Sequence, residues 1–120
     1  MTPSPRLILV VDDNSIMREA LTAVLGNAGY AVSQASNGNA AIAYAREHPV
    51  GLLITDLVMP EQEGIETIQH FVKGFPHIPI IAVSGMPEYL PMAKALGAAA
   101  VLEKPVTRAK LLEAVRKLIG

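Results

Sequence analysis

The sequence predicts one α/β domain, in which a parallel sheet of five strands is covered by helices on both faces. Five short segments rich in Val, Ile and Leu alternate with segments whose apolar residues recur at helical spacing. The five short segments are mostly apolar, as strands buried on both faces are. Strict alternation of strand and helix requires right-handed crossovers, and a closed barrel would need eight such units. The sheet is therefore expected to be open and doubly wound.

The expected elements are spread over the whole chain. The strands are predicted at residues 7–11, 31–35, 52–55, 80–83 and 100–102. The first helix begins after a cap at Asn14 or Ser15, and Gly29 ends it. The remaining helices are predicted at about residues 38–47, 64–71, 87–96 and 107–119.

Two prolines stand near the start of the fourth predicted helix. Pro87 and Pro91 frame its first turn. A proline deep inside a helix removes a hydrogen bond and clashes with the preceding turn. We therefore expect this helix to begin late or to be mobile.

Composition excludes several classes of protein. The chain has 120 residues, the size of one domain, and we expect residues 1–120 to form that domain with no output domain attached. Ten basic and eleven acidic residues give a net charge of −1 without a basic stripe, so direct nucleic-acid binding is disfavoured. The absence of cysteine excludes disulfides and thiolate chemistry. No apolar run reaches the ~20 residues that span a bilayer and no signal peptide is visible, so we expect a cytoplasmic protein without a membrane partner.

Polar residues gather where the predicted strands end. Asp12 and Asp13 follow the first strand and Asp56 follows the third. Ser84 follows the fourth strand, and Lys104 follows the fifth. Ligands of doubly wound sheets bind at the carboxyl ends of the strands. We therefore expect these five side chains to form one site.

The chemistry of this set points to a divalent cation and a phosphoryl group. Three converging carboxylates repel one another unless a cation neutralises them. Oxygen ligands favour Mg²⁺, Mn²⁺ or Ca²⁺, and Mg²⁺ commonly combines one or two carboxylates with a phosphate oxygen. Lys104 supplies a fixed cation and Ser84 a hydroxyl donor for the oxygens of a transferring phosphoryl group, so one carboxylate serves as the nucleophile. Mg²⁺ is the expected cofactor, and Mn²⁺ is expected to substitute for it.

The chain resembles the receiver domain of two-component response regulators from residue 7 to residue 119. The acidic pair, the segment 56–64, Ser84 and the Lys104-Pro105 step match the motifs of that family in order. The resemblance implies a flavodoxin-like (βα)5 fold with strand order 2-1-3-4-5. It implies that Asp56 is the phosphoacceptor, that the backbone carbonyl of Val58 joins Asp12, Asp13 and Asp56 as a metal ligand, and that the Lys104-Pro105 bond is cis.

The resemblance also implies a function and partners. It implies a signalling switch rather than an enzyme for other substrates, one that catalyses its own phosphorylation and dephosphorylation on Asp56. The donor would be a histidine kinase or a histidine phosphotransfer protein that docks near Asn14, Ile16, Met17 and Ala20. The downstream protein would bind the face formed by the fourth helix, the fifth strand and the fifth helix. The family usually carries an aromatic relay residue three positions before the lysine, where this sequence has Val101.

Other interpretations remain open on the sequence. Each of these residues also has an ordinary structural interpretation when it is considered alone. Asp12 or Asp13 would cap a helix, Asp56 would be a turn residue, and Lys104 would be a solvated lysine. An aspartate-nucleophile phosphatase shares the alternating architecture but usually places a second aspartate two residues after the nucleophile, where Val58 stands here. A nucleotide-binding or flavin-binding module would need a glycine-rich loop after the first strand, which is absent. A degenerate receiver and a receiver cut from a longer regulator are further alternatives.

Overall fold

Strands and helices alternate along the chain in the predicted order. The computed structural model describes residues 7–57 and 63–120. The strands are β1 (Leu7–Val11), β2 (Ala31–Ala35), β3 (Val50–Asp56), β4 (Ile80–Ser84) and β5 (Ala100–Glu103). The helices are α1 (Ser15–Asn27), α2 (Gly38–Glu47), α3 (Glu63–Gly74), α4 (Leu90–Leu96) and α5 (Arg108–Ile119), and the 3-10 turn η2 (Pro87–Tyr89) precedes α4.

The five strands form one parallel sheet. Their spatial order is β2-β1-β3-β4-β5, which confirms the predicted topology and places β3 at the centre. The register brings the carboxyl ends of neighbouring strands together, because Val11 pairs with Thr55 and Ser84 pairs with Glu103. Side chains that follow these pairs therefore meet at one edge of the sheet, which we call the carboxyl edge.

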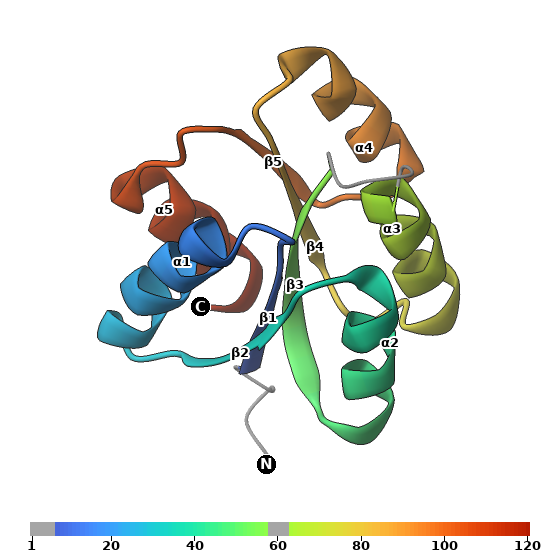
Figure 1. The fold of residues 1–120 in the computed structure, drawn as a ribbon, viewed down its shortest axis with the longest axis horizontal. Helices are drawn as coiled ribbons and strands as arrows, with labels where there is room; N and C mark the ends of the chain where they lie inside the picture. The colour runs from blue at the N-terminus through green and yellow to red at the C-terminus, as the bar shows by residue number, and fades with distance from the viewer. Residues whose placement is uncertain (1–6, 58–62) are drawn as a thin grey trace.

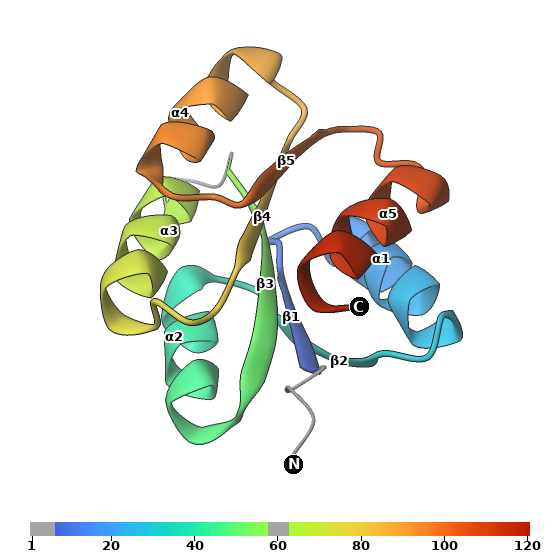
Figure 2. The same cartoon turned by 180° about the vertical axis from the view of Figure 1, so that it is seen from behind.

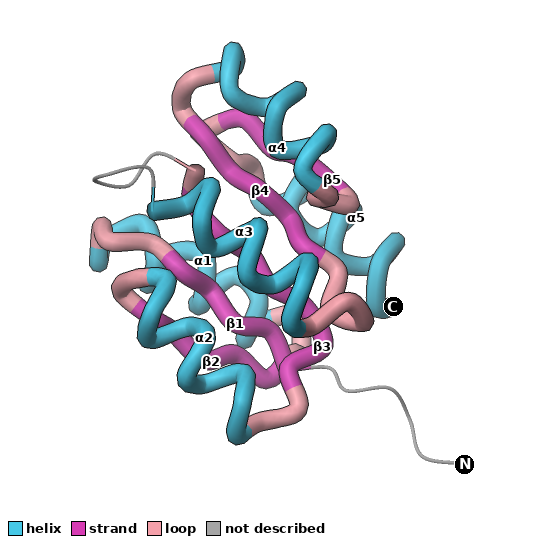
Figure 3. Tube along the Cα trace, turned by 90° about the vertical axis from the view of Figure 1, so that its right-hand side faces the viewer, coloured by secondary structure: helices cyan, strands magenta, loops and turns pink. Residues whose placement is uncertain are grey.

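Helices cover both faces of the sheet (Figure 1). α1 and α5 lie side by side on one face, and α2, α3 and α4 lie on the other, as the view from behind also shows (Figure 2). Seen from the side of α2, α3 and α4, the strands run beneath these helices (Figure 3). Each face of the sheet is thus buried, as the apolar strands predict.

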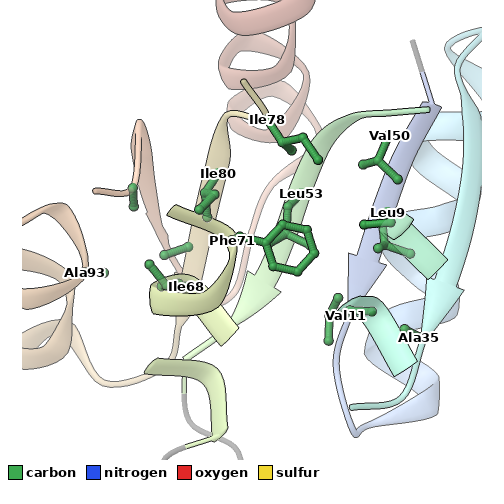
Figure 4. Close-up of a cluster of buried hydrophobic side chains, with 14 of the residues drawn as sticks. Leu9, Val11, Ala35, Val50, Leu53, Ile68, Phe71, Ile78, Ile80 and Ala93 are labelled. Carbon is green, nitrogen blue, oxygen red and sulfur yellow. The ribbon is translucent and has the colours of Figure 1, made fainter. Parts of the chain in front are cut away.

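Alternate strand residues enter two hydrophobic cores. In β1, Leu9 packs toward α2, α3 and α4, whereas Ile8 packs toward α1 and α5. Phe71 of α3 is fully buried in the first core and lies among Leu53 and Ile80 (Figure 4). Burying an aromatic side chain of this size contributes roughly 1.5–3 kcal/mol. The two cores hold the strands in register and so fix the carboxyl edge.

Four predicted elements are shorter than the observed ones: β4 and β5 each end one residue later than predicted, and β3 and α3 differ more. β3 begins two residues before the predicted range 52–55 and ends one residue after it, because Val50 pairs with Leu7 and Asp56 pairs with Val83. α3 begins one residue before the predicted range 64–71 and ends three residues after it. Within the described ranges, each helix is too short or too polar to cross a bilayer.

The prediction that the fourth helix begins late is confirmed. The first three residues of the predicted range 87–96 form the 3-10 turn η2, and α4 starts only at Leu90. Pro91 therefore lies in the first turn of α4, where a backbone N–H has no intrahelical acceptor to lose. α4 contains seven residues and has no side-chain cap.

Candidate functional site

The carboxyl edge gathers three carboxylates. Asp12 and Asp13 follow β1, and Asp56 is the last residue of β3. Asp12 and Asp56 are buried, with exposed fractions of 2% and 6%, whereas Asp13 is exposed. One carboxylate oxygen from each of the three lies within 4.8 Å of the others. The structure thus brings Asp56 next to the Asp12-Asp13 pair, from which it is distant in the sequence.

Local hydrogen bonds shape the acidic turn between β1 and α1. The carboxylate of Asp12 accepts a hydrogen bond from the backbone N–H of Asn14 at 2.9 Å. The side chain of Asn14 accepts from the backbone N–H of Met17 at 3.0 Å, so Asn14, and not Ser15, caps α1. The Asp13 carboxylate accepts no hydrogen bond from any residue that the structure describes. Asp13 therefore offers the most accessible oxygen of the cluster.

Lys104 links the acidic turn to the end of β3. Its Nζ donates to Oδ2 of Asp56 at 3.1 Å and to Oδ2 of Asp12 at 3.3 Å. Burial by itself lowers the pKa of Lys104, but the hydrogen bonds and negative charges of Asp56 and Asp12 outweigh it and raise the pKa above its ordinary value. Lys104 is therefore a permanent cation at neutral pH. The Lys104-Pro105 peptide bond is cis, as the resemblance implies.

Ser84 is fully buried and its hydroxyl faces its own loop. The backbone N–H of Met86 donates to Oγ of Ser84 at 3.0 Å, and that hydroxyl donates to the Met86 carbonyl oxygen at 3.2 Å. The carbonyl oxygen of Ser84 accepts from the backbone N–H of Lys104 at 2.9 Å. The strand ends that carry Ser84 and Lys104 are thus directly joined, while the hydroxyl is engaged with the segment that leads to η2.

The first turn of α3 packs against the end of β3. A Cβ atom built on Gly64 would lie 2.3 Å from the backbone oxygen of Asp56 and 2.6 Å from that of Leu57, so only glycine fits there. The side chain of Glu63 accepts a hydrogen bond from the backbone N–H of Gly38 at the start of α2. Val58, the expected backbone ligand, lies outside the described residues.

The donor set fits a hard divalent cation. Three carboxylates face one ammonium group, so the formal charge of the cluster is −2. The oxygen donors belong to carboxylates, which suit Mg²⁺ or Mn²⁺ better than softer metals. Asp12, Asp13 and Asp56 are the residues able to hold such an ion.

The residues predicted to contact a kinase lie at the cap and in the N-terminal half of α1, and Val101 lies on β5. Ile16 on α1 is 80% exposed, Asn14 and Ala20 are exposed, and Met17 is half-buried against the core under α1 and α5. Val101 on β5 is half-buried and packs against the core under α2, α3 and α4.

Sequence reasoning missed Arg18, whose guanidinium donates to the backbone carbonyl of Asp12 at 2.7 Å. Its only sequence signal is a basic residue one helical turn after the Asn14 cap.

Known proteins share both the sequence pattern and the fold. The profile of the response regulator receiver domain family matches residues 8–116. The chain is 35% identical over 116 residues to the response regulator receiver protein CpdR of Brucella abortus, covering 95% of this chain and 96% of that protein. It is 32% identical over 114 residues to the chemotaxis protein CheY of Thermotoga maritima, covering 92% and 95%. The crystal structure of a CheY-like response regulator receiver domain protein from Methanospirillum hungatei matches with a TM-score of 0.86 at 28% identity, covering 95% of this chain and 93% of that one.

Proposed function

The chain belongs to the response regulator receiver domain family, and from this membership we propose that Asp56 accepts a phosphoryl group from a phosphohistidine donor. The observation that carries the proposal is the pair of hydrogen bonds from Lys104 to Asp56 and Asp12 beside an exposed Asp13. This arrangement leaves carboxylate oxygens available to a cation. It also places the fixed positive charge of Lys104 beside the carboxylate of Asp56. An ordinary ion pair would need neither the third carboxylate nor the exposed edge.

The proposed step conserves atoms and charge. A carboxylate oxygen of Asp56 forms a bond to phosphorus, the bond from phosphorus to the donor imidazole nitrogen breaks, and the electron pair of that bond stays on the imidazole. The product is an acyl phosphate on Asp56. Water later attacks the phosphorus, which releases inorganic phosphate and restores the carboxylate.

Each residue of the site has a proposed role in this step. Asp12, Asp13 and Asp56 would hold Mg²⁺, with the Val58 carbonyl as a further ligand, and the bound ion would supply positive charge to the phosphoryl oxygens. Lys104 would bind a phosphoryl oxygen and offset its charge.

Ser84 provides the proposed link to a change of shape. Its hydroxyl is bonded to Met86, so turning that hydroxyl toward a phosphoryl group on Asp56 breaks both bonds to Met86. The loop before η2 then loses the two hydrogen bonds that hold Met86 to Ser84. We propose that this release alters the face formed by α4, β5 and α5.

Two surfaces are proposed for partners. A histidine kinase or phosphotransfer protein would contact the first turns of α1 at Asn14, Ile16, Met17 and Ala20, where Ile16 exposes a large apolar side chain. A downstream protein would bind the α4, β5 and α5 face. That face carries a hollow of about 480 Å³, and its lining includes Leu102, Lys94 and Lys110.

Acetyl phosphate tests the proposal directly. The protein is incubated with acetyl phosphate and Mg²⁺, and intact mass is measured for the wild type and for Asp56→Asn. We expect the wild type to gain the mass of one phosphoryl group, and we expect no gain in Asp56→Asn or when EDTA removes the metal. Equal labelling of wild type and Asp56→Asn would refute Asp56 as the acceptor.

A further inference from the structure

Arg18 braces the acidic turn from outside the carboxylate cluster. It lies on α1, and its Nη1 donates to the backbone carbonyl oxygen of Asp12 at 2.7 Å. Its Nε donates to Oε1 of Gln34 on β2 at 2.9 Å. One planar side chain therefore joins the end of β1, the helix α1 and the edge strand β2. A charged donor makes such hydrogen bonds stronger than neutral ones.

The bonded carbonyl belongs to the peptide unit that connects Asp12 to Asp13. On the other side of the same residue, the backbone N–H of Asp12 donates to the carbonyl of Ala35 at 3.2 Å. Both backbone groups of Asp12 are thus fixed, and because the peptide unit is planar, the starting direction of Asp13 is fixed with them. No described side chain holds the Asp13 carboxylate itself. The direction of the Asp13 carboxylate therefore depends on the backbone.

We propose that Arg18 is a positioning residue for divalent cation binding, because it fixes the peptide unit that aims the Asp13 carboxylate at Asp56. This inference rests on the proposed function for the location of the cation. The charge of Arg18 acts in the opposite direction, since a guanidinium near three carboxylates repels a cation. Neutralising Arg18 therefore weakens cation binding if it positions the turn and strengthens cation binding if it acts only through charge.

The test compares Mg²⁺ dissociation constants, measured from backbone amide shifts during titration with MgCl₂. Arg18→Met keeps the length of the side chain but removes the charge and all donors. Gln34→Met removes only the outer acceptor. Arg46→Met is the matched control, because Arg46 is an exposed arginine in the last turn of α2, far from the carboxyl edge, and its side chain forms no hydrogen bond with the described residues. Urea unfolding verifies that each variant is folded.

We expect Arg18→Met to weaken Mg²⁺ binding by about tenfold, as loss of an outer support of a metal ligand does. Gln34→Met should weaken it less, and Arg46→Met should leave it unchanged. Unchanged or tighter binding in Arg18→Met overturns the inference. If Arg18→Met does not fold, Arg18→Lys replaces it. Lysine keeps the charge but has only one donor group for two separated acceptors. A Mg²⁺ affinity equal to that of the wild type in Arg18→Lys also overturns the inference.

Amide exchange separates this inference from the proposed function. The N–H of Asn14 is bonded to the carboxylate of Asp12, so its exchange rate without metal reports the order of the turn. Faster exchange in Arg18→Met than in Arg46→Met supports the brace, and equal exchange overturns it. If wild type shows neither Mg²⁺ binding nor phosphorylation, the proposed function fails and the role of Arg18 in cation binding fails with it. The exchange rates then decide only whether Arg18 orders the turn.

Discussion

The two segments that flank Asp56 are held in different ways. The turn between β1 and α1 has a side-chain cap, a brace from Arg18 and a buried carboxylate bonded to its own backbone. The segment between β4 and β5 has a 3-10 turn and a seven-residue helix, neither with a side-chain cap, and it exposes Met86 and Met92. A phosphoacceptor needs fixed geometry where the cation binds and freedom where the signal leaves. The contrast between these segments fits that division.

The largest expected effect comes from cutting the link that joins the acidic turn to Asp56. Lys104→Met removes the ammonium that bonds both Asp12 and Asp56. We expect the rate of phosphorylation by acetyl phosphate to fall by about 100-fold, because a fixed positive charge at the transferring group is lost. Intact mass over time measures the rate, and Lys110→Met on the exposed surface of α5 is the control. A rate equal to that of the control would show that Lys104 is only structural.

The caps of the two segments allow a direct comparison of stability. Asn14→Ala removes the cap of α1 and should lower the free energy of unfolding by about 1 kcal/mol. Met86 precedes η2 and makes no side-chain cap bond, so Met86→Ala should change it by less than about 0.5 kcal/mol. Urea denaturation measures both. Equal losses in the two variants would contradict the difference between the segments.

The hydroxyl of Ser84 is expected to hold the looser segment. Ser84→Ala removes both hydrogen bonds to Met86, with a net loss of stability of roughly 0.5–1 kcal/mol. The amide of Met86 should exchange with solvent faster, while the amide of Asn14 should not change. If both amides changed alike, the two segments would behave as one unit.

The smallest effect concerns the pH dependence of stability. The pKa of Lys104 is raised in the fold, so its contribution to stability is complete below its ordinary pKa of 10.5 and is lost as pH rises through the higher folded value. We expect the stability difference between wild type and Lys104→Met to be constant from neutral pH to about pH 10 and to shrink above it. A difference that shrinks near neutral pH would contradict a raised pKa.

Much of the fold follows from local patterns in the sequence. Apolar strands, helical spacing and glycine or proline stops predict the alternation of elements and nearly all of their positions. β3 extends beyond its predicted ends because pairing with β1 and β4 stabilises residues that have no strong local signal. α3 continues past Phe71 to Gly74, and the carbonyl oxygen of Phe71 accepts a hydrogen bond from the backbone N–H of Phe75. The sequence does not distinguish Asn14 from Ser15 as the cap of α1, because both side chains suit that position.

For this protein, the sequence alone determined which polar residues stand at the carboxyl ends of the strands, and therefore which carboxylates, hydroxyl and lysine reach the carboxyl edge. That inference works because parallel strands place their carboxyl ends together whatever the details of packing. Only the tertiary structure decided that Lys104 bonds Asp12 and Asp56 at once, and that Arg18 holds the acidic turn while it also bonds Gln34 of β2. These contacts join elements or loops whose approach depends on the helices packing across the sheet, and no local pattern in the chain encodes those distances.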